Sequence, residues 1–276
     1  MSTLLLPTIE PFDGESLLAF LAARAIAGVE EVIGGTYRRT AALEHGGVVL
    51  AATPEAAGVR CELRLDDPDD AAARCRRLFD LDADPEAIAA GLARDPLLAP
   101  LVRRRPGLRV PGAVDGFEMA ARAIVGQQVS VAGARTVLGR LVAEYGEPLA
   151  QADGGLTHRF PAPAALAEAD PAALPFPRTR AEALVTVAGL AAGGELRLDG
   201  QADPGEVRAA LTAVRGVGPW TASYVAMRAL GDPDAFLPGD VGIRHALAGL
   251  GSGADDERWR PWRSYAVMHL WRTLDG

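Results

Sequence analysis

Two glycine-rich turns in the last quarter of the chain carry the residue types best suited to chemistry. The first is Arg215-Gly216-Val217-Gly218, followed by Pro219 and Trp220. Apolar periodicity on both sides predicts two helices joined by this turn, with proline at the first position of the second helix. The glycines let a ligand approach the backbone, and the N–H groups of the turn lie at the positive end of a helix dipole. The turn therefore suits a phosphate group, although a bare Gly-x-Gly is also compatible with an ordinary connection between helices.

The second turn holds a single carboxylate, Asp240, which lies 22 residues after Gly218 in the sequence Phe236-Leu237-Pro238-Gly239-Asp240. Asp240 precedes a predicted helix over 241–250, where an aspartate commonly acts as an N-cap. That role and a catalytic role are compatible, because the helix dipole and the helix N–H groups favour the charged carboxylate. A fixed anion close behind a phosphate-binding turn is expected to face the sugar of a nucleotide rather than its base.

Three aromatic side chains accompany these turns: Trp220, Tyr224 and Trp271. Trp220 and Tyr224 are four residues apart on one predicted helix and therefore share a face. A cleft lined by aromatic rings attracts cationic rings through stacking and cation–π interactions. For each of the three taken alone, packing in the hydrophobic core is the alternative interpretation.

The charge of the chain is unevenly distributed. In total there are 28 basic and 36 acidic residues, a net charge of −8. Residues 1–90 contain 8 arginines against 16 acidic residues, whereas residues 101–140 contain seven arginines against Asp115 and Glu118. Binding to phosphates needs local rather than global positive potential, so the acidic balance does not exclude nucleic acid as a partner. Such a stretch is also common on an ordinary solvated surface.

Lysine is absent, so all the basic residues are arginines. A GC-rich genome explains this bias, together with the abundance of alanine and glycine. The chemical consequence is independent of the cause: no side-chain amine is available to form a Schiff base.

Metal, disulfide and membrane signals are missing from the sequence. The two cysteines, Cys61 and Cys75, are too few for a disulfide framework, and together with the four histidines they show no metal-ligand spacing. There is no run of 18 apolar residues, and the N-terminal MSTLLLP is too short for a signal peptide. We therefore expect a soluble, cytoplasmic, metal-independent monomer that does not bind membranes.

The first third of the chain has the pattern of an α+β unit. An apolar-periodic helix over Glu15–Ala27 precedes four predicted strands with alternating or β-branched sequence. These strands are Val29–Ile33, Tyr37–Glu44, Val48–Thr53 and Val59–Leu65. After about residue 85 we expect only helices, with a Gly/Pro-rich loop over 146–162. The predicted fold class is α+β, a small antiparallel-sheet N-terminal domain followed by an all-helical body.

Several segments together resemble one family. The quoted segments are Phe20-Leu21-Ala22-Ala23-Arg24-Ala25, Arg77-Leu78-Phe79-Asp80-Leu81, Pro106-Gly107-Leu108-Arg109-Val110-Pro111-Gly112, Ala123-Ile124-Val125-Gly126-Gln127-Gln128-Val129-Ser130-Val131 and Trp259-Arg260-Pro261-Trp262-Arg263-Ser264-Tyr265. With the hairpin and the aspartate loop, the sequence resembles the helix-hairpin-helix/Gly-Pro-Asp superfamily of DNA glycosylases. Within it, the chain is similar to the AlkA-type 3-methyladenine DNA glycosylases II, in the same order and spacing along essentially its whole length.

The resemblance implies a DNA repair enzyme that flips alkylated purines, of the 3-methyladenine and 7-methylguanine type, out of double-stranded DNA. It would hydrolyse the N-glycosidic bond and leave an abasic site. Asp240 matches the essential aspartate, which stabilises positive charge at C1′. Trp220, Tyr224 and Trp271 match the base pocket. Gly216, Val217 and Gly218 match the hairpin that holds a DNA phosphate.

The resemblance also implies an architecture and a location. A domain over 1–90 would precede two helical lobes. One comprises 91–112 and 233–276 and carries the aspartate loop, and the other comprises 113–232 and carries the helix-hairpin-helix. The family further implies a monovalent cation at the hairpin carbonyls and a place in the bacterial cytoplasm or nucleoid.

Three positions define which branch of the superfamily the chain is similar to. Bifunctional members carry a Schiff-base lysine two residues after the second hairpin glycine, where this chain has Trp220, so we expect a monofunctional glycosylase without lyase activity. The family's leucine wedge, which fills the gap left by the flipped base, corresponds to Gln128. A glutamine fills space and hydrogen-bonds the widowed base, but it is a poorer apolar wedge. No cysteine follows Cys75, which excludes the iron–sulfur cluster of other branches.

Two other functions are compatible with parts of this pattern. The first is a non-catalytic helix-hairpin-helix DNA-binding protein, which would need neither Asp240 nor an aromatic pocket. The second is the same fold excising a different lesion, such as hypoxanthine, which Gln128 and the shape of the pocket would decide.

Overall fold

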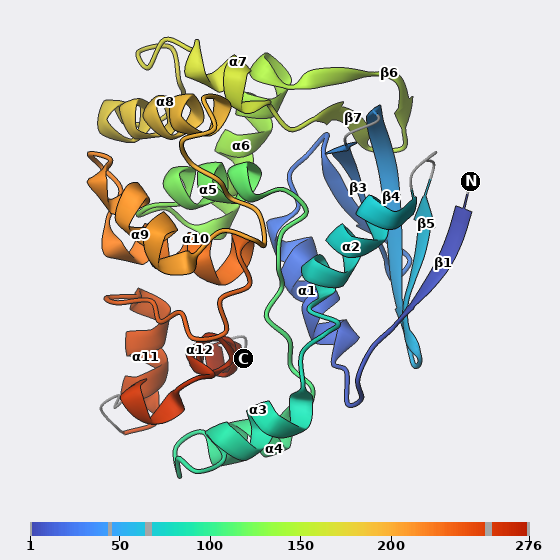
Figure 1. Ribbon diagram of the computed structural model, residues 1–276, viewed down its shortest axis with the longest axis vertical. Coiled ribbons are helices and arrows are strands. Elements are labelled where there is room, and N and C mark those ends of the chain that lie inside the picture. The colour runs from blue at the N-terminus through green and yellow to red at the C-terminus, as the bar shows by residue number, and fades with distance from the viewer. Residues whose placement is uncertain (1, 44–45, 64–67, 252–255, 275–276) are drawn as a thin grey trace.

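The computed structural model describes residues 2–43, 46–63, 68–251 and 256–274. Its N-terminal part is a five-stranded antiparallel sheet with the strand order β1-β5-β4-β3-β2 (Figure 1). The strands are β1 (Ser2–Pro7), β2 (Glu30–Ile33), β3 (Thr36–Leu43), β4 (Gly46–Glu55) and β5 (Gly58–Leu63). The four predicted strands are confirmed, although the predicted ends at 44 and 64–65 lie outside the described residues. Strand β1 was not predicted, because its run of three leucines does not alternate.

Helices α1 (Gly14–Arg24) and α2 (Pro68–Phe79) cover one face of this sheet. Figure 1 shows both helices between the sheet and the helical body. Leu17 from α1 and Phe79 from α2 are buried in one hydrophobic cluster with Tyr37 and Cys61 from the sheet. The inward position of Cys61, opposite Leu4 and Ala52 in the neighbouring strands, follows from the strict alternation of β5.

The body is built mainly from helices. They are α3 (Pro85–Leu92), α4 (Ala99–Arg104), α5 (Gly116–Val125), α6 (Val131–Tyr145), α7 (Pro163–Ala167), α8 (Arg178–Ala192), α9 (Pro204–Ala213), α10 (Pro219–Ala229), α11 (Val241–Gly249) and α12 (Arg263–Trp271), with short 3-10 helices at Asp256–Trp259 and Arg272–Leu274. Local chemistry explains many of the starts. Asp84, Asp115, Asp203 and Asp240 each accept a hydrogen bond from an amide in the first turn of the helix that follows.

The body has two hydrophobic cores. One joins α5, α6, α8, α9 and α10, and the other joins α3, α4, α11 and α12. Tyr224 packs against both cores, and Trp220 and Trp271 pack against the second. These aromatic residues therefore lie at the boundary between the two cores. The clusters resemble the predicted lobes, but the division into domains stays a prediction.

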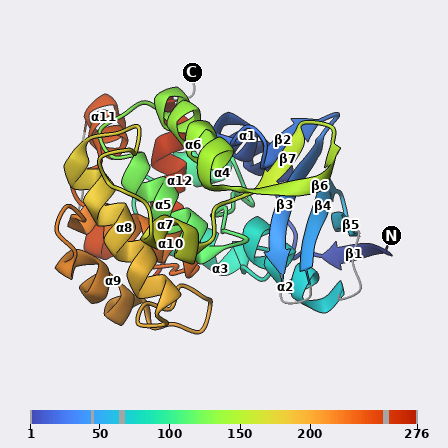
Figure 2. The same ribbon diagram turned by 90° about the horizontal axis from the view of Figure 1, so that it is seen from above.

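Residues 146–162 correct the expectation of an all-helical body. Strands β6 (Glu147–Asp153) and β7 (Leu156–Arg159) pair as an antiparallel hairpin. Figure 2 shows this hairpin reaching from the body to the sheet. The hydroxyl of Thr40 in β3 donates to the carbonyl of His158 (2.8 Å), and Arg38 pairs with Asp153 (2.6 Å). The glycines that indicated a loop instead flank and connect the two strands, whereas Pro148 lies within β6 opposite His158.

No helix in the described part of the chain is long and apolar enough to cross a membrane.

Candidate active site

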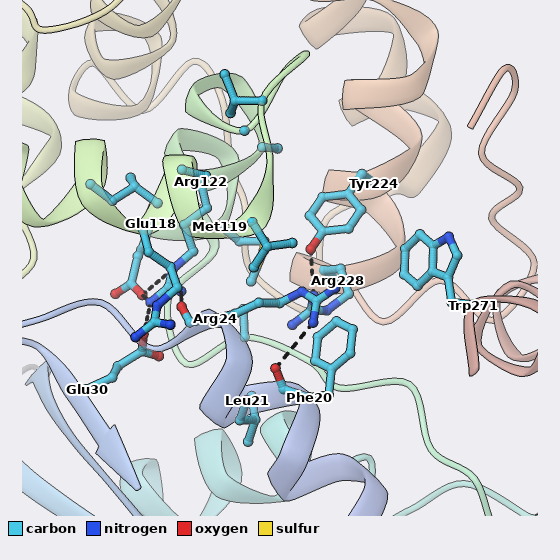
Figure 3. Close-up of a pocket in the computed structure, with 18 of the residues that line it drawn as sticks. Phe20, Leu21, Arg24, Glu30, Glu118, Met119, Arg122, Tyr224, Arg228 and Trp271 are labelled. Atoms are coloured by element: carbon cyan, nitrogen blue, oxygen red, sulfur yellow. Dashed lines mark hydrogen bonds and ion pairs between the residues drawn. The ribbon is translucent and has the colours of Figure 1, made fainter. Parts of the chain in front are cut away.

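A cavity of about 490 Å³ opens where α1, α10, the start of α11 and the end of α12 meet. Its lining includes all three predicted aromatic residues and Asp240. Figure 3 shows Tyr224 and Arg228 from α10, Phe20 from α1 and Trp271 around this space. The structure therefore brings together residues that are far apart in the sequence.

The Asp240 carboxylate is held by three donors. Its Oδ1 accepts from the Ile243 amide (2.8 Å) and from Nε1 of Trp271 (3.0 Å), and its Oδ2 accepts from Nε1 of Trp220 (2.8 Å). The side chain is half-buried and lines the cavity. Asp240 is thus an N-cap of α11 and a cavity residue at once, so the two interpretations of its role are both compatible with the geometry. A carboxylate accepts at about four sites, and Oδ2 retains capacity for a further donor.

The aromatic side chains form a continuous wall. The rings of Trp220 and Tyr224 are stacked, with centroids 5.2 Å apart and an interplanar angle of 9°. Trp271 lies 6.4 Å from Tyr224 at an angle of 48°. All three are half-buried and line the cavity, and both indoles direct their N–H groups to Asp240. The wall therefore offers π surface beside a fixed negative charge.

The hairpin between α9 and α10 has the expected form. Gly216 adopts a left-handed backbone (φ 92°), and a Cβ there would lie 3.1 Å from the Thr179 carbonyl, so both conformation and space require glycine. Val217 is buried, and Gly218 precedes Pro219, the first residue of α10. No side chain caps α10. Its first-turn N–H groups are therefore available for an anion.

Gln128 lies in the turn between α5 and α6, exposed and with a left-handed backbone (φ 55°). The neighbouring Gln127 anchors this turn to the hairpin. Its Nε2 donates to the Gly216 carbonyl (3.1 Å) and to the Thr221 hydroxyl (3.0 Å). Arg180 donates to the Gln127 carbonyl from the other side (2.7 Å). Sequence reasoning missed Gln127, because nothing in its type or spacing indicates a partner 89 residues away.

The arginine-rich stretch 101–140 is only partly a surface feature. Arg109 is buried and donates to the Ile9 carbonyl (2.5 Å), and Arg122 belongs to a buried ion cluster. The exposed members are Arg103, Arg104, Arg135 and Arg140. The charge count therefore overestimated the positive surface of this stretch. Arg215 in the hairpin and Arg244 in α11 are exposed near the site and were not singled out.

The far end of the cavity is closed by four charged residues from different elements: Glu30, Arg39, Glu118 and Arg122, here called the ion quartet. Glu118 pairs with Arg39 (2.5 Å) and Arg122 (2.6 Å), and Glu30 also contacts both arginines. Burial alone raises the pKa of Glu30, but the two arginines and a hydrogen bond from Tyr37 lower it to about 2. The quartet pairs two carboxylates with two guanidinium groups, so its formal charges cancel.

Arg228 is a further cavity residue that the sequence interpretation did not include. It follows Trp220 and Tyr224 at the same spacing of four on α10, and that periodicity was an available signal. Its Nη1 donates to the Tyr224 hydroxyl (2.7 Å), Nη2 donates to the Gly112 carbonyl (3.3 Å), and Nε donates to the Pro111 carbonyl. Phe20 and Arg24 of α1 complete this side of the cavity.

The described residues contain no group of three or more His, Cys, Asp or Glu side chains that could hold a metal ion.

Sequence comparisons connect this architecture to known proteins. Residues 3–115 match the AlkA N-terminal domain family. A relative from Mycobacterium tuberculosis is named a probable bifunctional transcriptional activator/DNA repair enzyme AlkA. It is 48% identical over 99% of this chain, but this chain spans only 57% of the relative's length. The Escherichia coli DNA-3-methyladenine glycosylase 2 is 40% identical, with 95% of this chain and 94% of the relative covered.

Solved structures show the same fold. A 3-methyladenine DNA glycosylase from Archaeoglobus fulgidus superposes with a TM-score of 0.82 over 99% of this chain and 98% of its own, at 24% identity. The Schizosaccharomyces pombe 3-methyladenine DNA glycosylase Mag1, solved with abasic DNA, superposes with a TM-score of 0.55 over 68% of this chain and 96% of its own, at 21% identity. By its sequence similarity to the E. coli protein over nearly the full length of both, the chain belongs to the AlkA family of DNA-3-methyladenine glycosylases.

Proposed function

We propose that this protein is a monofunctional DNA glycosylase that hydrolyses the N-glycosidic bond of alkylated purines in double-stranded DNA. The observation that carries the proposal is the Asp240 carboxylate, held by two indole N–H groups and a helix amide at the edge of an aromatic cavity. Family membership agrees with this chemistry. A non-catalytic DNA-binding protein would need neither the fixed carboxylate nor the cavity.

The chemistry follows from where charge develops. As the C1′–N bond breaks, its electron pair goes to the base and positive charge grows on the sugar. A carboxylate about 4 Å from that charge, at an effective dielectric constant of about 20, contributes about 4 kcal/mol, or roughly a thousandfold in rate. Water then adds to C1′ and loses a proton, which leaves an abasic site. An N3- or N7-alkylated purine is already cationic and leaves as a neutral molecule, so it needs no general acid.

The substrate must leave the double helix to reach this carboxylate. A stacked base lies out of reach of Asp240, so the nucleotide has to be flipped into the cavity. The wall of Trp220, Tyr224 and Trp271 would stack against a flipped alkylated base. Exposed Gln128 is our candidate for the side chain that fills the gap in the helix. The uncapped start of α10 at Gly216–Gly218 would hold a phosphate.

The absence of lysine supports hydrolysis without strand cleavage. Trp220 occupies the helix position at which a Schiff-base amine would be needed, and its indole N–H is bound to Asp240. Because the sequence contains no lysine side chain, no such amine can attack C1′. We therefore expect the DNA backbone to stay intact after base release.

No organic cofactor or iron–sulfur cluster enters this proposal. The hairpin carbonyls fit a monovalent cation, since a carbonyl has two lone pairs and that of Gly216 uses one for Gln127. Such a cation would attract a phosphate. Base release itself depends on none of these carbonyls. We expect the protein to act as a monomer in the cytoplasm.

The test measures base release from DNA treated with a methylating agent, comparing wild type with Asp240→Asn. We expect wild type to release methylpurines and to leave alkali-labile, uncut sites. Asp240→Asn should release them about a thousandfold more slowly and still bind DNA. The matched control is Asp84→Asn, which alters the N-cap of α3 and should keep the wild-type rate. Wild-type protein that releases no alkylated base would overturn the proposal.

A further inference from the structure

Arg228 is a buried cation in the wall of the cavity. It is 3% exposed, and its three hydrogen-bond acceptors are the carbonyls of Pro111 and Gly112 and the hydroxyl of Tyr224. Its guanidinium carbon lies 4.8 Å from the ring centroid of Phe20 and 5.5 Å from that of Tyr224. Among the described residues, none of its hydrogen-bond partners is a carboxylate. Burying a guanidinium without a carboxylate partner costs free energy, which indicates that Arg228 serves a purpose beyond packing.

The neighbouring charges only partly offset that of Arg228. The carboxylates of Glu30 and Glu118 are both paired within the ion quartet, which has no net charge. Arg24 also lines the cavity, with its guanidinium 3.6 Å from the Phe20 ring. Burial lowers the pKa of Arg228 and nearby Arg122 acts in the same direction, while Tyr224 and Glu30 partly oppose this shift. The guanidinium nevertheless stays protonated at neutral pH, because its pKa starts above about 12.

The cavity consequently has a negative charge at one end and a positive charge at the other. Asp240 contacts Trp220 (2.8 Å), Trp220 stacks on Tyr224, and Tyr224 contacts Arg228 (2.7 Å). An anion and a cation thus lie at opposite ends of two stacked rings. A base bound against those rings, with its sugar near Asp240, would have its own ring system on the Arg228 side.

We infer that Arg228 is a specificity-determining residue that extends base release to neutral lesions such as hypoxanthine. The inference rests on the proposed function. When the C1′–N bond of a neutral base breaks, the electron pair leaves with the base as an anion, which a nearby cation stabilises. The anion then takes a proton from solvent, and water supplies the hydroxyl at C1′.

A cationic base responds in the opposite way. It is repelled by Arg228 while bound, and this repulsion disappears as the base departs neutral and positive charge moves toward Asp240. Measured from free DNA, the cost of this repulsion on binding cancels the gain on departure, so Arg228 contributes little to kcat/KM for a cationic base. The two lesion classes should separate when the charge at position 228 is removed.

The experiment measures the rate constant kcat/KM for release of hypoxanthine and of 7-methylguanine from duplexes of matched sequence, because this constant compares the transition state with free DNA. Arg228→Gln removes the charge and keeps a donor, and Arg228→Lys keeps the charge. In Arg228→Gln we expect the hypoxanthine rate to fall at least about tenfold more than the 7-methylguanine rate, which corresponds to about 1.4 kcal/mol. Arg228→Lys should return the ratio of the two rates toward that of wild type. Arg228→Met replaces Arg228→Gln if thermal melting shows that the latter is unfolded.

Equal loss on both substrates in the neutral variants would overturn the inference and leave Arg228 a structural residue. The inference would also be overturned if the ratio of the hypoxanthine rate to the 7-methylguanine rate were the same in Arg228→Lys as in Arg228→Gln. Wild-type protein that releases 7-methylguanine but no hypoxanthine also overturns it, while the proposed function stands. Wild-type protein that releases neither base contradicts the proposed function itself.

Discussion

At the level of single residues, the Asp240 carboxylate illustrates how this cavity is organised before substrate binds. Two of its three donors are indole N–H groups whose rings also form the cavity wall. Each tryptophan thus contributes a π surface to the cavity wall and a hydrogen bond to Asp240. A hydrogen bond to a charged group contributes about 1.5–3 kcal/mol, so the orientation of Asp240 depends measurably on each indole.

Trp271→Phe separates these contributions, because it keeps an aromatic ring and removes the donor to Oδ1 of Asp240. We expect kcat/KM for methylpurine release to fall about tenfold or more, with DNA affinity within about twofold of wild type. Trp262→Phe is the control: Trp262 packs against Tyr265, away from the cavity lining. A similar loss of activity in both variants would mean that the hydrogen bond to Asp240 is not the cause.

Sequence reasoning identified some site residues and missed others for physical reasons. Asp240, Trp220 and Tyr224 were predictable, because their positions relative to a helix start are local properties. Arg228 shares their helix face, but an arginine at a helical position normally extends into solvent. Its burial depends on the carbonyls of Pro111 and Gly112, which come from a distant segment.

At the level of elements, the turn between α5 and α6 and the α9–α10 hairpin are a connected pair. Gln127 joins them through two hydrogen bonds, and the exposed Gln128 follows directly. If the hairpin holds a phosphate and Gln128 enters the helix, Gln127 sets the distance between these two contacts with DNA.

Gln127→Ala should therefore lower activity as well as stability. We expect the free energy of unfolding to fall by about 1–2 kcal/mol for the two lost hydrogen bonds. Base release under single-turnover conditions should fall about tenfold, since the turn no longer presents Gln128 at a fixed place. Gln151→Ala, at an exposed position in β6, is the matched control. Unchanged base release in a less stable Gln127→Ala protein would argue against this coupling.

Some strands and helices could be predicted from the sequence, and others could not. Alternating sequence was sufficient for β2 to β5, and capping aspartates and prolines marked many helix starts. Strand β1 and the β6–β7 hairpin were missed, because both depend on pairing partners. The hairpin is stabilised by contacts with Thr40 and Arg38 in β3, more than 100 residues away in the chain. No local pattern in a Gly/Pro-rich segment encodes such a contact.

At the level of the whole molecule, two buried groups make stability depend on pH in opposite directions. Burial raises the pKa of Asp80 from 3.8 to about 6, despite hydrogen bonds from Val110 and Tyr265. Burial lowers the pKa of His269 from 6.5 to about 4, and Arg105 adds to this shift. Between about pH 4 and 6, folded Asp80 binds more protons than in the unfolded chain, so its contribution falls as pH rises. Folded His269 binds fewer, so its contribution rises.

Asp80→Asn should expose this compensation. The variant keeps an acceptor for Val110 and Tyr265, and asparagine tolerates the positive φ of 51° at this position. Its free energy of unfolding relative to wild type should increase by about 2 kcal/mol between pH 4 and 6.5, most of the roughly 3 kcal/mol that the whole Asp80 pKa shift represents. Urea unfolding of both proteins across this range gives the difference. A constant difference would show that Asp80 titrates normally.

The ion quartet has a consequence for how the protein can evolve. Glu30 and Arg39 belong to the sheet, whereas Glu118 and Arg122 belong to α5. Each half holds one internal ion pair, but the pairs Arg39–Glu118 (2.5 Å) and Arg122–Glu30 exist only when the two halves meet. Removing one member of such a buried network costs about 3–5 kcal/mol, a large part of the stability of a typical domain. The acidic first third is therefore not an interchangeable module. Recombination that inherits the sheet from one parent and the helical body from another would survive only where both parents preserve all four charges.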